Sequence, residues 1–540
     1  MKTNLHKLFK PSRVFIAMAA MALPMAAAAN QSLNYAGYAS TTGGVVNEGS
    51  LHSSSFNPAG NNLLLKQNER LRFGYLSNLG GYIEIGDVND LDTIVDNLVD
   101  DIDALNDFNG LGEDYLKDRF GDATEAEYYE AVAESANDLI PALEKGGQIS
   151  GGFQVQAPLT PLLIRSRSTK GTFSVNASVS AQFKGGFLGG PFGVKTTLGD
   201  YGALEIDLSS AANAYTAIRD FIGDSDTSNL TTQKIEDIKD ILEKAGLFSA
   251  ANKETVDNLF DAAANNSDTI DNVGVKSELT TNSGLDVKAA VVAHLALGYG
   301  TNLSDWFNLN TKHGTLEAGL RLNMYNVETG RNFISLQAEA KSNDDESTSD
   351  KLTEDFLDNT ETSTGLGVDV GFLWHAKNYQ AGITFYNLNE PSFDYPDLSQ
   401  VLKDDALTAL HGLQTAGKAQ VQEAVTLTRH AVVEAAYFSN SRNWMLQGAY
   451  TLGTATNFVG EEFQNLHVSA GYYPKSAWIP GLRAGYSQNM KGTELSKIHA
   501  GATFFGIMHL DVSMATETSS FDDNEIPRYL AFSLGFEEKF

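Results

Sequence analysis

The chain has 540 residues, with 68 acidic against 38 basic side chains and no cysteine, so its formal net charge is −30. The lack of cysteine excludes disulfides, thiolate metal sites and thiol catalysis. Such an acidic chain is unsuited to nucleic acid, which is bound by clustered Lys and Arg side chains; a solvated acidic surface explains the charge at least as well as cation binding does.

Residues 1–29 have the layout of a cleavable secretory signal. Four basic residues within Lys2–Arg13 precede a short apolar run at Val14–Leu23, Pro24 ends the run, and Ala27–Ala29 supplies the small residues of a cleavage site. The run is too short to span a bilayer as a helix, which disfavours the alternative of an uncleaved anchor. No later stretch reaches 18 consecutive apolar residues, so we expect an exported chain without transmembrane helices.

From Thr172 to Phe540 apolar and polar residues alternate with a period of two in about 14 segments, each near the length of a tilted membrane strand. Weaker candidates lie at 70–77, 82–86 and 153–158. In the last segment, one face carries only large apolar side chains apart from Glu538; they are Leu530, Phe532, Leu534, Phe536 and Phe540. This pattern predicts strands with one face toward lipid.

The opposite faces of these segments carry charged residues, which would not suit the dry core of a soluble β-sandwich, the alternative fold. These residues are Asp207, Lys288, Glu317, Arg321, Glu339, Asp369, Glu434, Arg483 and Asp511. We take Arg321, Asp369, Glu434, Arg483 and Asp511 as candidate lumen-lining residues of a wet interior. The predicted fold is all-β: an antiparallel transmembrane β-barrel of about 14 to 16 strands over residues 69–540, in the outer membrane of a Gram-negative cell.

Acidic segments with helical periodicity interrupt the strands near 88–145, 211–265 and 397–422. In the second of them Ile235, Ile238 and Leu242 form an apolar seam that Gly246 terminates. Lipid would not accept the acidic faces of these helices, so we expect them at a rim of the barrel or inside its lumen. They fit a lid, a plug or a partner surface, and equally a passive decoration of loops.

The sequence does not favour an enzyme, a metal site or a cofactor. Asp107–Gly110 is similar to part of a calcium-binding loop, but Leu105 and Leu116 occupy the positions that need Asp and Glu. Three histidines fall on lumen-facing positions of late strands, where polar filling of the lumen is favoured over a metal site; they are His467, His499 and His509. We predict no catalytic residue.

Two segments resemble known families. Ser53–Gly60 contains Asn-Pro-Ala-Gly, which resembles the signature of FadL-type long-chain fatty acid transporters. That resemblance implies an N-terminal hatch, placed here at residues 30–68, with Asn57, Pro58 and Ala59 as hatch residues. We expect Asn57 to tie the hatch to lumen side chains such as Arg321 or Arg483.

Residues 367–373 (GVDVGFL), 379–393 (YQAGITFYNLNEPSF) and 482–489 (LRAGYSQN) are similar to the TraF-like plasmid transfer proteins. This resemblance spans most of the mature chain and implies the barrel fold. The family's namesake is a thioredoxin-like periplasmic protein, but thioredoxin chemistry needs Cys-x-x-Cys, which this chain lacks. The family name therefore does not supply the function.

The predicted function is to bind or pass a hydrophobic or amphipathic small molecule, as FadL-type transporters do. The alternative is a structural protein whose barrel anchors a secretion or conjugation partner that docks on the acidic helices. A cavity beside the hatch would favour the first, and an apolar patch on the helices the second. Expected partners are outer-membrane lipid and the barrel-assembly machinery, with Phe536 and Phe540 as the assembly signal.

Overall fold

The computed structural model of the protein describes residues 38–65, 69–87, 112–222, 227–307, 311–341, 359–521 and 524–537, with single positions between 97 and 105. The predicted signal segment, the start of the hatch and Phe540 lie outside the described residues. So does most of the helix that the pattern places between Leu91 and Leu105.

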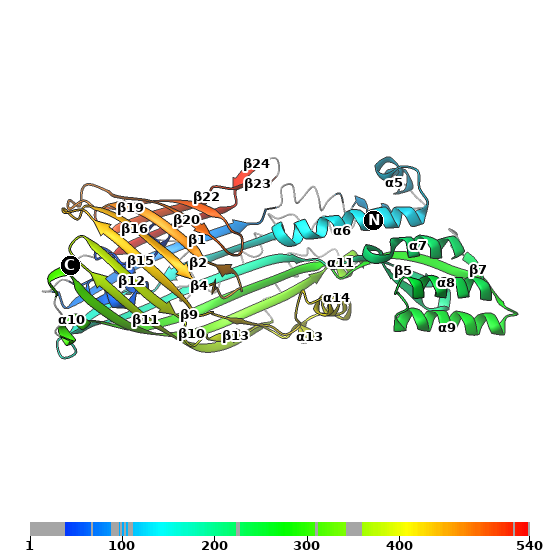
Figure 1. Ribbon diagram of the computed structural model, residues 1–540, viewed down its shortest axis with the longest axis horizontal. Helices are drawn as coiled ribbons and strands as arrows, with labels where there is room; N and C mark the ends of the chain where they lie inside the picture. Colours follow the sequence, from blue (N-terminus) through cyan, green and yellow to red (C-terminus); the bar gives the residue numbers. More distant parts are fainter. Residues whose placement is uncertain are drawn as a thin grey trace.

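Within the described residues, fourteen antiparallel strands close into a barrel (Figure 1), and β25 completes it by pairing with β1. The barrel strands, in chain order, are β1 (Leu71–Ile85), β2 (Gln148–Gln156), β4 (Gly171–Leu188), β9 (Gly284–Asn302), β10 (Thr315–Ser335), β11 (Thr360–His375), β12 (Tyr379–Tyr386), β15 (His430–Phe438), β16 (Trp444–Leu452), β19 (Asn465–Tyr472), β20 (Gly481–Asn489), β21 (Ser496–Phe504), β22 (Met508–Ala515) and β25 (Tyr529–Glu537). The short strand β3 (Leu162–Ser166) continues the course of β2, since both strands pair with β1 on one side and β4 on the other.

The two faces of the strands are those that the period-two pattern predicts. On β25, Leu530 and Phe532 are 48% and 56% exposed, whereas Ala531 and Ser533 on the opposite face are each 2% exposed. The same alternation recurs around the barrel and leaves an outer surface of large apolar side chains; examples are Leu297, Leu320, Phe372, Leu446, Val468, Leu482, Ile498 and Leu510. An apolar outer surface of this kind is what lipid requires of a membrane barrel. The predicted fold class is therefore confirmed.

The period-two pattern did not show which of the alternating segments join the barrel. In the described part of the chain, twelve of the barrel strands follow Gly171, and the barrel is completed by β1 and β2, which arise from the weaker upstream segments. Segments 70–77 and 82–86 belong to one continuous strand, β1. Some of the alternating sequence after Thr172 forms a separate four-stranded sheet, because alternation reports a two-faced strand and not the sheet that it joins.

That sheet has the order β6-β5-β8-β7 and, with three helices, forms a module beyond one end of the barrel (Figure 1). Its elements are β5 (Phe192–Leu198), β6 (Ala203–Asp207), β7 (Thr227–Thr231), β8 (Thr269–Thr281), α7 (Leu208–Ile222), α8 (Thr232–Lys244) and α9 (Ala250–Asn265). Helix α6 (Glu125–Gly146) shares its apolar core. Asp207 therefore ends a module strand and Glu339 lies in a helix, so placing these two residues on barrel-strand faces was wrong.

Local sequence explains the helices. Thr124 and Glu127 form a capping box at the start of α6, which provides partners for free backbone N–H groups. In α8 the side chain of Thr231 caps the first turn, the seam of Ile235, Ile238 and Leu242 is fully buried, and Gly246 follows with a φ of +73°. None of the described helices is long and apolar enough to cross a membrane.

The barrel has two unlike ends. At the end where β1 begins and β25 finishes, the connections range from three residues (376–378 and 505–507) to 14 residues (157–170). We call this the turn end. At the opposite, loop end, segments 86–147, 189–283 and 387–429 are long and carry the helices (Figure 1).

The remaining described elements are short. In the hatch they are α3 (Tyr38–Thr42), η2 (Leu51–Ser55) and η3 (Pro58–Asn62). At the loop end they are α5 (Glu113–Phe120), η5 (Gly199–Tyr201), α11 (Leu336–Lys341), β13 (Ser392–Asp394), α13 (Leu398–Val401), α14 (Asp404–Thr415), β14 (Ala424–Thr426), β17 (Ala455–Thr456), β18 (Glu462–Phe463), β23 (Thr518–Phe521) and β24 (Asn524–Pro527), and at the turn end α10 (Leu303–Trp306) and η6 (Thr311–His313). The helix predicted near 397–422 is thus two short helices.

Candidate functional site

Residues 38–65, the described part of the predicted hatch, lie inside the barrel. We call them the plug. Its three helical turns pack against strands from all around the wall, α3 against β19 to β22 and η3 against β4 and β9 to β11. Nearly all of its side chains are buried, among them polar residues such as Ser53, Ser54 and Asn61. Buried polar groups need partners, and the barrel wall supplies them.

The Asn-Pro-Ala segment begins η3 in the manner of a capped helix. The Oδ1 atom of Asn57 accepts a hydrogen bond from Ala59 N at 3.0 Å, and Pro58 occupies the first position, where no backbone donor is needed. The backbone of Asn57 is extended, with a φ of −106°. These three residues therefore fix the direction in which the chain enters its last plug turn.

A row of three glycines receives this turn. Gly300, Gly319 and Gly371 are paired side by side on β9, β10 and β11. A Cβ atom on Gly300 would lie 2.6 Å from the Pro58 carbonyl oxygen, and one on Gly371 would lie 2.9 Å from Pro58 Cδ. Such separations are too short for real atoms, so the wall accepts the plug here only because it has no side chains. Alternation of apolar and polar residues alone does not reveal this cradle, although glycine at lumen-facing positions of three successive strands is its visible signal.

Asn57 is anchored by Glu434, which corrects the expected link to Arg321 or Arg483. Its Nδ2 atom donates to Glu434 Oε1 at 2.8 Å and to the Phe372 carbonyl at 3.2 Å. The other carboxylate oxygen of Glu434 accepts the backbone N–H of Val46 at 2.7 Å. One carboxylate on β15 thus holds two parts of the plug, because the cap on η3 turns the amide toward β11 and β15.

Arg321 and Asp369 form a buried pair that holds the end of η2. Arg321 Nη2 lies 2.8 Å from Asp369 Oδ2, and its Nη1 donates to the Ser55 carbonyl at 2.6 Å. Both side chains are 2% exposed or less. The charge of the guanidinium is neutralised by the aspartate, while its remaining donors bind carbonyls at the C-terminal end of the turn, where a cation is favourable.

Arg483 and Asp511 hold the first plug turn in the same way. Arg483 Nη2 lies 2.8 Å from Asp511 Oδ1, and Thr41 Oγ1 donates to the same oxygen at 2.7 Å. The guanidinium also stacks 4.6 Å from the ring of Tyr38. All five candidate lumen-lining residues therefore face the lumen, but they are buried against the plug rather than hydrated as the pattern implied.

Among the described residues, the three lumen histidines do not converge on one metal site. The rings of His467 and His499 lie 5.2 Å apart. Both ring nitrogens of His499 contact serine hydroxyls at 2.8 Å, those of Ser487 and Ser513, and His509 Nδ1 contacts Thr503 Oγ1 at 2.9 Å. Across the described residues, no group of three or more His, Cys, Asp or Glu side chains is arranged to hold a metal ion.

A lid lies at the loop end of the lumen. It consists of residues 391–427 and 455–463, which fold over the inner side of β9 and β10 and share a core with Tyr325 and Val327. Tyr395 Oη donates to the Phe458 carbonyl at 2.8 Å and joins the two parts of the lid. Arg331 ties the lid to the wall, since its Nε atom lies 2.8 Å from Asp286 and its Nη1 atom 3.2 Å from Glu423.

A cavity of about 220 Å³ lies between the plug and the lid. The plug contributes Ser40, Gly43, Gly44 and Phe56 to its walls, and the strands and lid contribute five further aromatic rings: Tyr82, Tyr325, Tyr386, Phe463 and Tyr529. Six phenylalanine and tyrosine rings thus line the cavity among many polar side chains, with the plug as its floor.

One corner of the cavity is charged. Lys497 Nζ lies 2.8 Å from Glu84 Oε2 and 3.6 Å from the centre of the Tyr529 ring. Glu461 of the lid accepts a hydrogen bond from Asn457 at 2.7 Å, and burial, together with the nearby Glu84 carboxylate, raises the pKa of Glu461. The site thus combines aromatic surface with fixed charges at one side, an arrangement that suits a molecule with an apolar body and a polar group.

Several solved barrels resemble the chain at low sequence identity. The toluene transporter TodX of Pseudomonas putida is 9% identical, with 91% of this chain and 93% of that chain covered and a TM-score of 0.33. The toluene transporter TbuX of Ralstonia pickettii is 8% identical, with coverages of 94% and 98% and a TM-score of 0.33. The monoaromatic hydrocarbon channel CymD is 9% identical, with coverages of 95% and 99% and a TM-score of 0.25.

No curated protein matches the chain significantly in sequence. A family model does, over residues 55–451, from the end of η2 through β16. That span includes the Asn-Pro-Ala-Gly turn, its glycine cradle and the segments 367–373 and 379–393 on which the resemblance rested. The chain belongs to the family described as F plasmid transfer operon, TraF, protein.

Proposed function

We propose that this protein is an outer-membrane channel of a Gram-negative cell that binds and passes a hydrophobic or amphipathic small molecule. The observation that carries the proposal is the cavity with six phenylalanine and tyrosine rings in the lumen between the plug and the lid. A cavity of about 220 Å³ suits a ligand smaller than a typical drug. The Glu84–Lys497 corner would orient the polar end of an amphipathic ligand.

The two ends of the barrel give the direction of passage. Outer-membrane barrels have short periplasmic turns and longer external loops, so the turn end would face the periplasm and the lid and module the outside. A ligand would then enter past the lid, rest above the plug and leave when the plug shifts. The plug is suited to such a shift, because many of its described links to the wall are hydrogen bonds, which water and ligand groups can replace.

The proposed partners follow from the surface of the barrel. The apolar outer residues would contact membrane lipid, and the final strand, with Phe536 and Phe540, would be recognised by the barrel-assembly machinery. The alternative function, an anchor for a secretion or conjugation partner, would need a docking patch on the helices. Among the described residues of α5 to α9, Tyr115 is the sole large hydrophobic side chain exposed by 36% or more, so we favour the channel.

The test is to fill the cavity from its wall. Ala449 lies on the lumen face of β16 and lines the cavity, so Ala449→Trp should block it. Ala470 is exposed on the lipid face of the neighbouring strand β19, which makes Ala470→Trp a matched control of the same size. Uptake of radiolabelled toluene and of a medium-chain fatty acid would be measured in cells lacking the native protein, with folding checked by heat-modifiability on gels.

We expect wild type and Ala470→Trp to take up at least one probe faster than the empty vector, and Ala449→Trp to lose that uptake. Equal uptake by wild type and the empty vector would instead support the anchor function. Native mass spectrometry of the purified wild type adds an independent readout, since a bound lipid or small molecule should be present in wild type and absent from Ala449→Trp.

A further inference from the structure

The joint between the first and last strands is the least regular part of the barrel wall. Along β1 and β25 the pairs are Gly74–Glu537, Leu76–Phe536 and Leu79–Leu534, so β1 gains an extra residue at each of two bulges. Ser77 and Asn78 fall within the second bulge. On the other side of β1, the ladder to β3 ends at Phe73 and the ladder to β2 starts at Leu79. The stretch 74–78 therefore lies between interrupted ladders on both of its edges.

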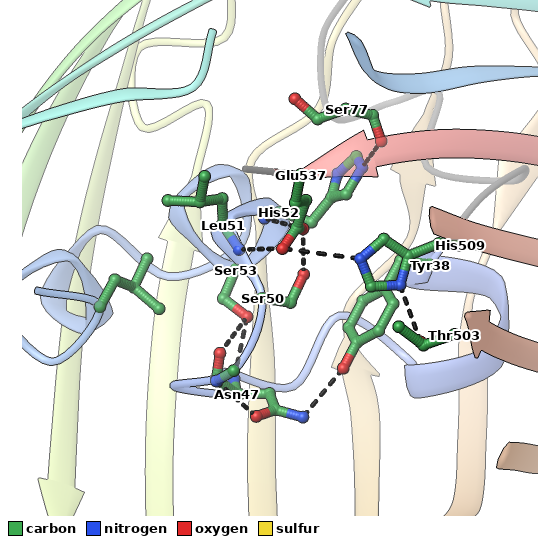
Figure 2. A network of polar contacts seen from close by, with 12 residues as sticks. Tyr38, Asn47, Ser50, Leu51, His52, Ser53, Ser77, Thr503, His509 and Glu537 are labelled. Carbon is green, nitrogen blue, oxygen red and sulfur yellow. Dashed lines mark hydrogen bonds and ion pairs between the residues drawn. The ribbon is translucent and has the colours of Figure 1, made fainter. Parts of the chain in front are cut away.

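The plug contacts both strands at this point (Figure 2). Ser50 Oγ donates to Glu537 Oε1 of β25 at 2.6 Å, and the backbone N–H groups of Leu51 and His52 donate to the same carboxylate at 3.1 and 3.3 Å. The ring of His52 turns to β1, where its Nε2 atom contacts the Ser77 carbonyl. A carbonyl oxygen only accepts, so Nε2 carries the proton of that hydrogen bond.

The wall is shaped to present these groups to the plug. Glu537 is 2% exposed and its carboxylate also faces His509 Nε2 of β22 at 3.6 Å, so its position is fixed from two sides. Gly535 lies beside the bulge, and a Cβ atom there would come closer than 3.0 Å to the Ser77 carbonyl. Glycine at this position thus lets the bulged strand lie close over β25.

We propose that the plug turn Ser50–His52 is the clasp that closes the barrel, by joining β1 to β25 where their own ladder is interrupted. The carboxylate of the last strand caps the first backbone N–H groups of η2, as an anion at a helix start does. Ser77 lies in the bulge, outside the regular β1–β25 pairs, and the ring of His52, at the second position of the same turn, donates to its carbonyl. Docking of the turn Ser50–His52 and closure of the barrel are then one event, while the rest of the plug can shift, and the plug has a structural role beyond obstructing the lumen.

The experiment asks whether a covalent joint between the strands replaces the clasp. The chain has no native cysteine, so Leu79→Cys with Leu534→Cys, a directly paired position on the lipid face, would place one disulfide across the joint. Leu320→Cys with Val370→Cys, paired on β10 and β11, is the matched control elsewhere in the wall. Each pair is combined with Glu537→Gln, with Gly535→Ala, or with Asn57→Ala, which loosens the plug away from the joint.

Purified full-length protein refolded into detergent would be heated in oxidised and reduced form, and the folded fraction read from its gel mobility. Loss of a buried charged partner should raise the unfolded fraction at a fixed temperature by roughly tenfold for Glu537→Gln. The disulfide at 79 and 534 should reverse that loss for Glu537→Gln and Gly535→Ala, but not for Asn57→Ala, and the control disulfide should not reverse it.

Equal rescue by both disulfides, or rescue of Asn57→Ala to the same degree as Glu537→Gln, would overturn the proposal, because the clasp would then be an ordinary plug contact. Stability of Glu537→Gln equal to that of wild type would overturn it as well. If Glu537→Gln does not refold in reduced form, recovery of folded barrel in the oxidised 79–534 form still supports it, and failure to recover contradicts it.

Discussion

Replacing Gly300 with alanine should lift the η3 turn of the plug off the wall while the clasp at Ser50–His52, and so the barrel, stays closed. The added Cβ atom would lie 2.6 Å from the Pro58 carbonyl oxygen, whereas ordinary contact begins at 3.4 Å, so the plug must move by 0.8 Å (3.4 − 2.6). It cannot slide sideways, because Gly371 on the far side of the cradle is already in close contact with Asn57 and Pro58. The turn must therefore lift toward the centre of the lumen.

The cost is about 1–3 kcal/mol for overpacking, with roughly 1 kcal/mol more if the hydrogen bond from Asn57 to Glu434 is lost. The control is Gly186→Ala on β4, where an added Cβ meets nothing within 4 Å. The assay is limited proteolysis of the refolded protein, with mass spectrometry to detect cuts between residues 38 and 65. Gly300→Ala should be cut there at a protease concentration that spares wild type and Gly186→Ala. Equal resistance of all three would refute the claim that the glycine row forms a tight cradle.

Three further predictions concern other parts of the molecule. Deleting Phe540 should lower the amount of heat-modifiable barrel in the outer membrane and leave protease-sensitive chain in the periplasm; equal folded amounts from both forms would contradict its role as an assembly signal. Arg331→Met should leave Asp286 and Glu423 still paired with Lys288 but without the guanidinium that joins them, and should destabilise the lid by about 1–3 kcal/mol, visible as faster proteolysis within 391–427 than in wild type. Burial opposes ionisation of Glu48, but hydrogen bonds from His375 and Arg442 outweigh it and lower the pKa of Glu48. The stability that Glu48 contributes should therefore be complete at neutral pH and decline as the pH falls below 4.5. Between pH 7 and pH 3, the melting temperature should fall less for Glu48→Gln than for wild type.

The sequence was informative wherever one residue spacing decides the outcome. A period of two places Leu530 and Ser533 on opposite faces whatever the rest of the chain does, so the barrel and the lumen positions of Arg321, Glu434 and Asp511 could be predicted. The apolar seam of α8 is local in the same sense.

The parts that failed depend on contacts between distant segments. Nothing near Asn57 in the chain indicates that its partner is Glu434, 377 residues away, and nothing near Asp207 indicates that its strand joins a sheet outside the barrel. The plug also changes the meaning of the lumen charges, because a residue facing inward is hydrated in an open channel and dry beneath a plug. The period of two shows toward which face a side chain points, whereas the tertiary fold decides whether the lumen on that face is filled by a plug.

The length of three wall strands has a mechanical consequence. β4, β9 and β10 contain 18, 19 and 21 residues, about twice the roughly 10 that a tilted strand needs to cross a bilayer. The β4–β9 ladder is unbroken from Gly171–Thr301 to Leu188–Gly284, so roughly eight residues at ~3.3 Å each extend it by some 25 Å, measured along the tilted strands, past the hydrocarbon layer. A paired ribbon of this kind resists bending in a way that a flexible linker does not. The ribbon thus carries the α/β module beyond the barrel mouth, with only residues 189–191 and 282–283 between them. A fluorophore on α9 should therefore follow tilting of the barrel more closely than a fluorophore on a domain tethered by a long linker would.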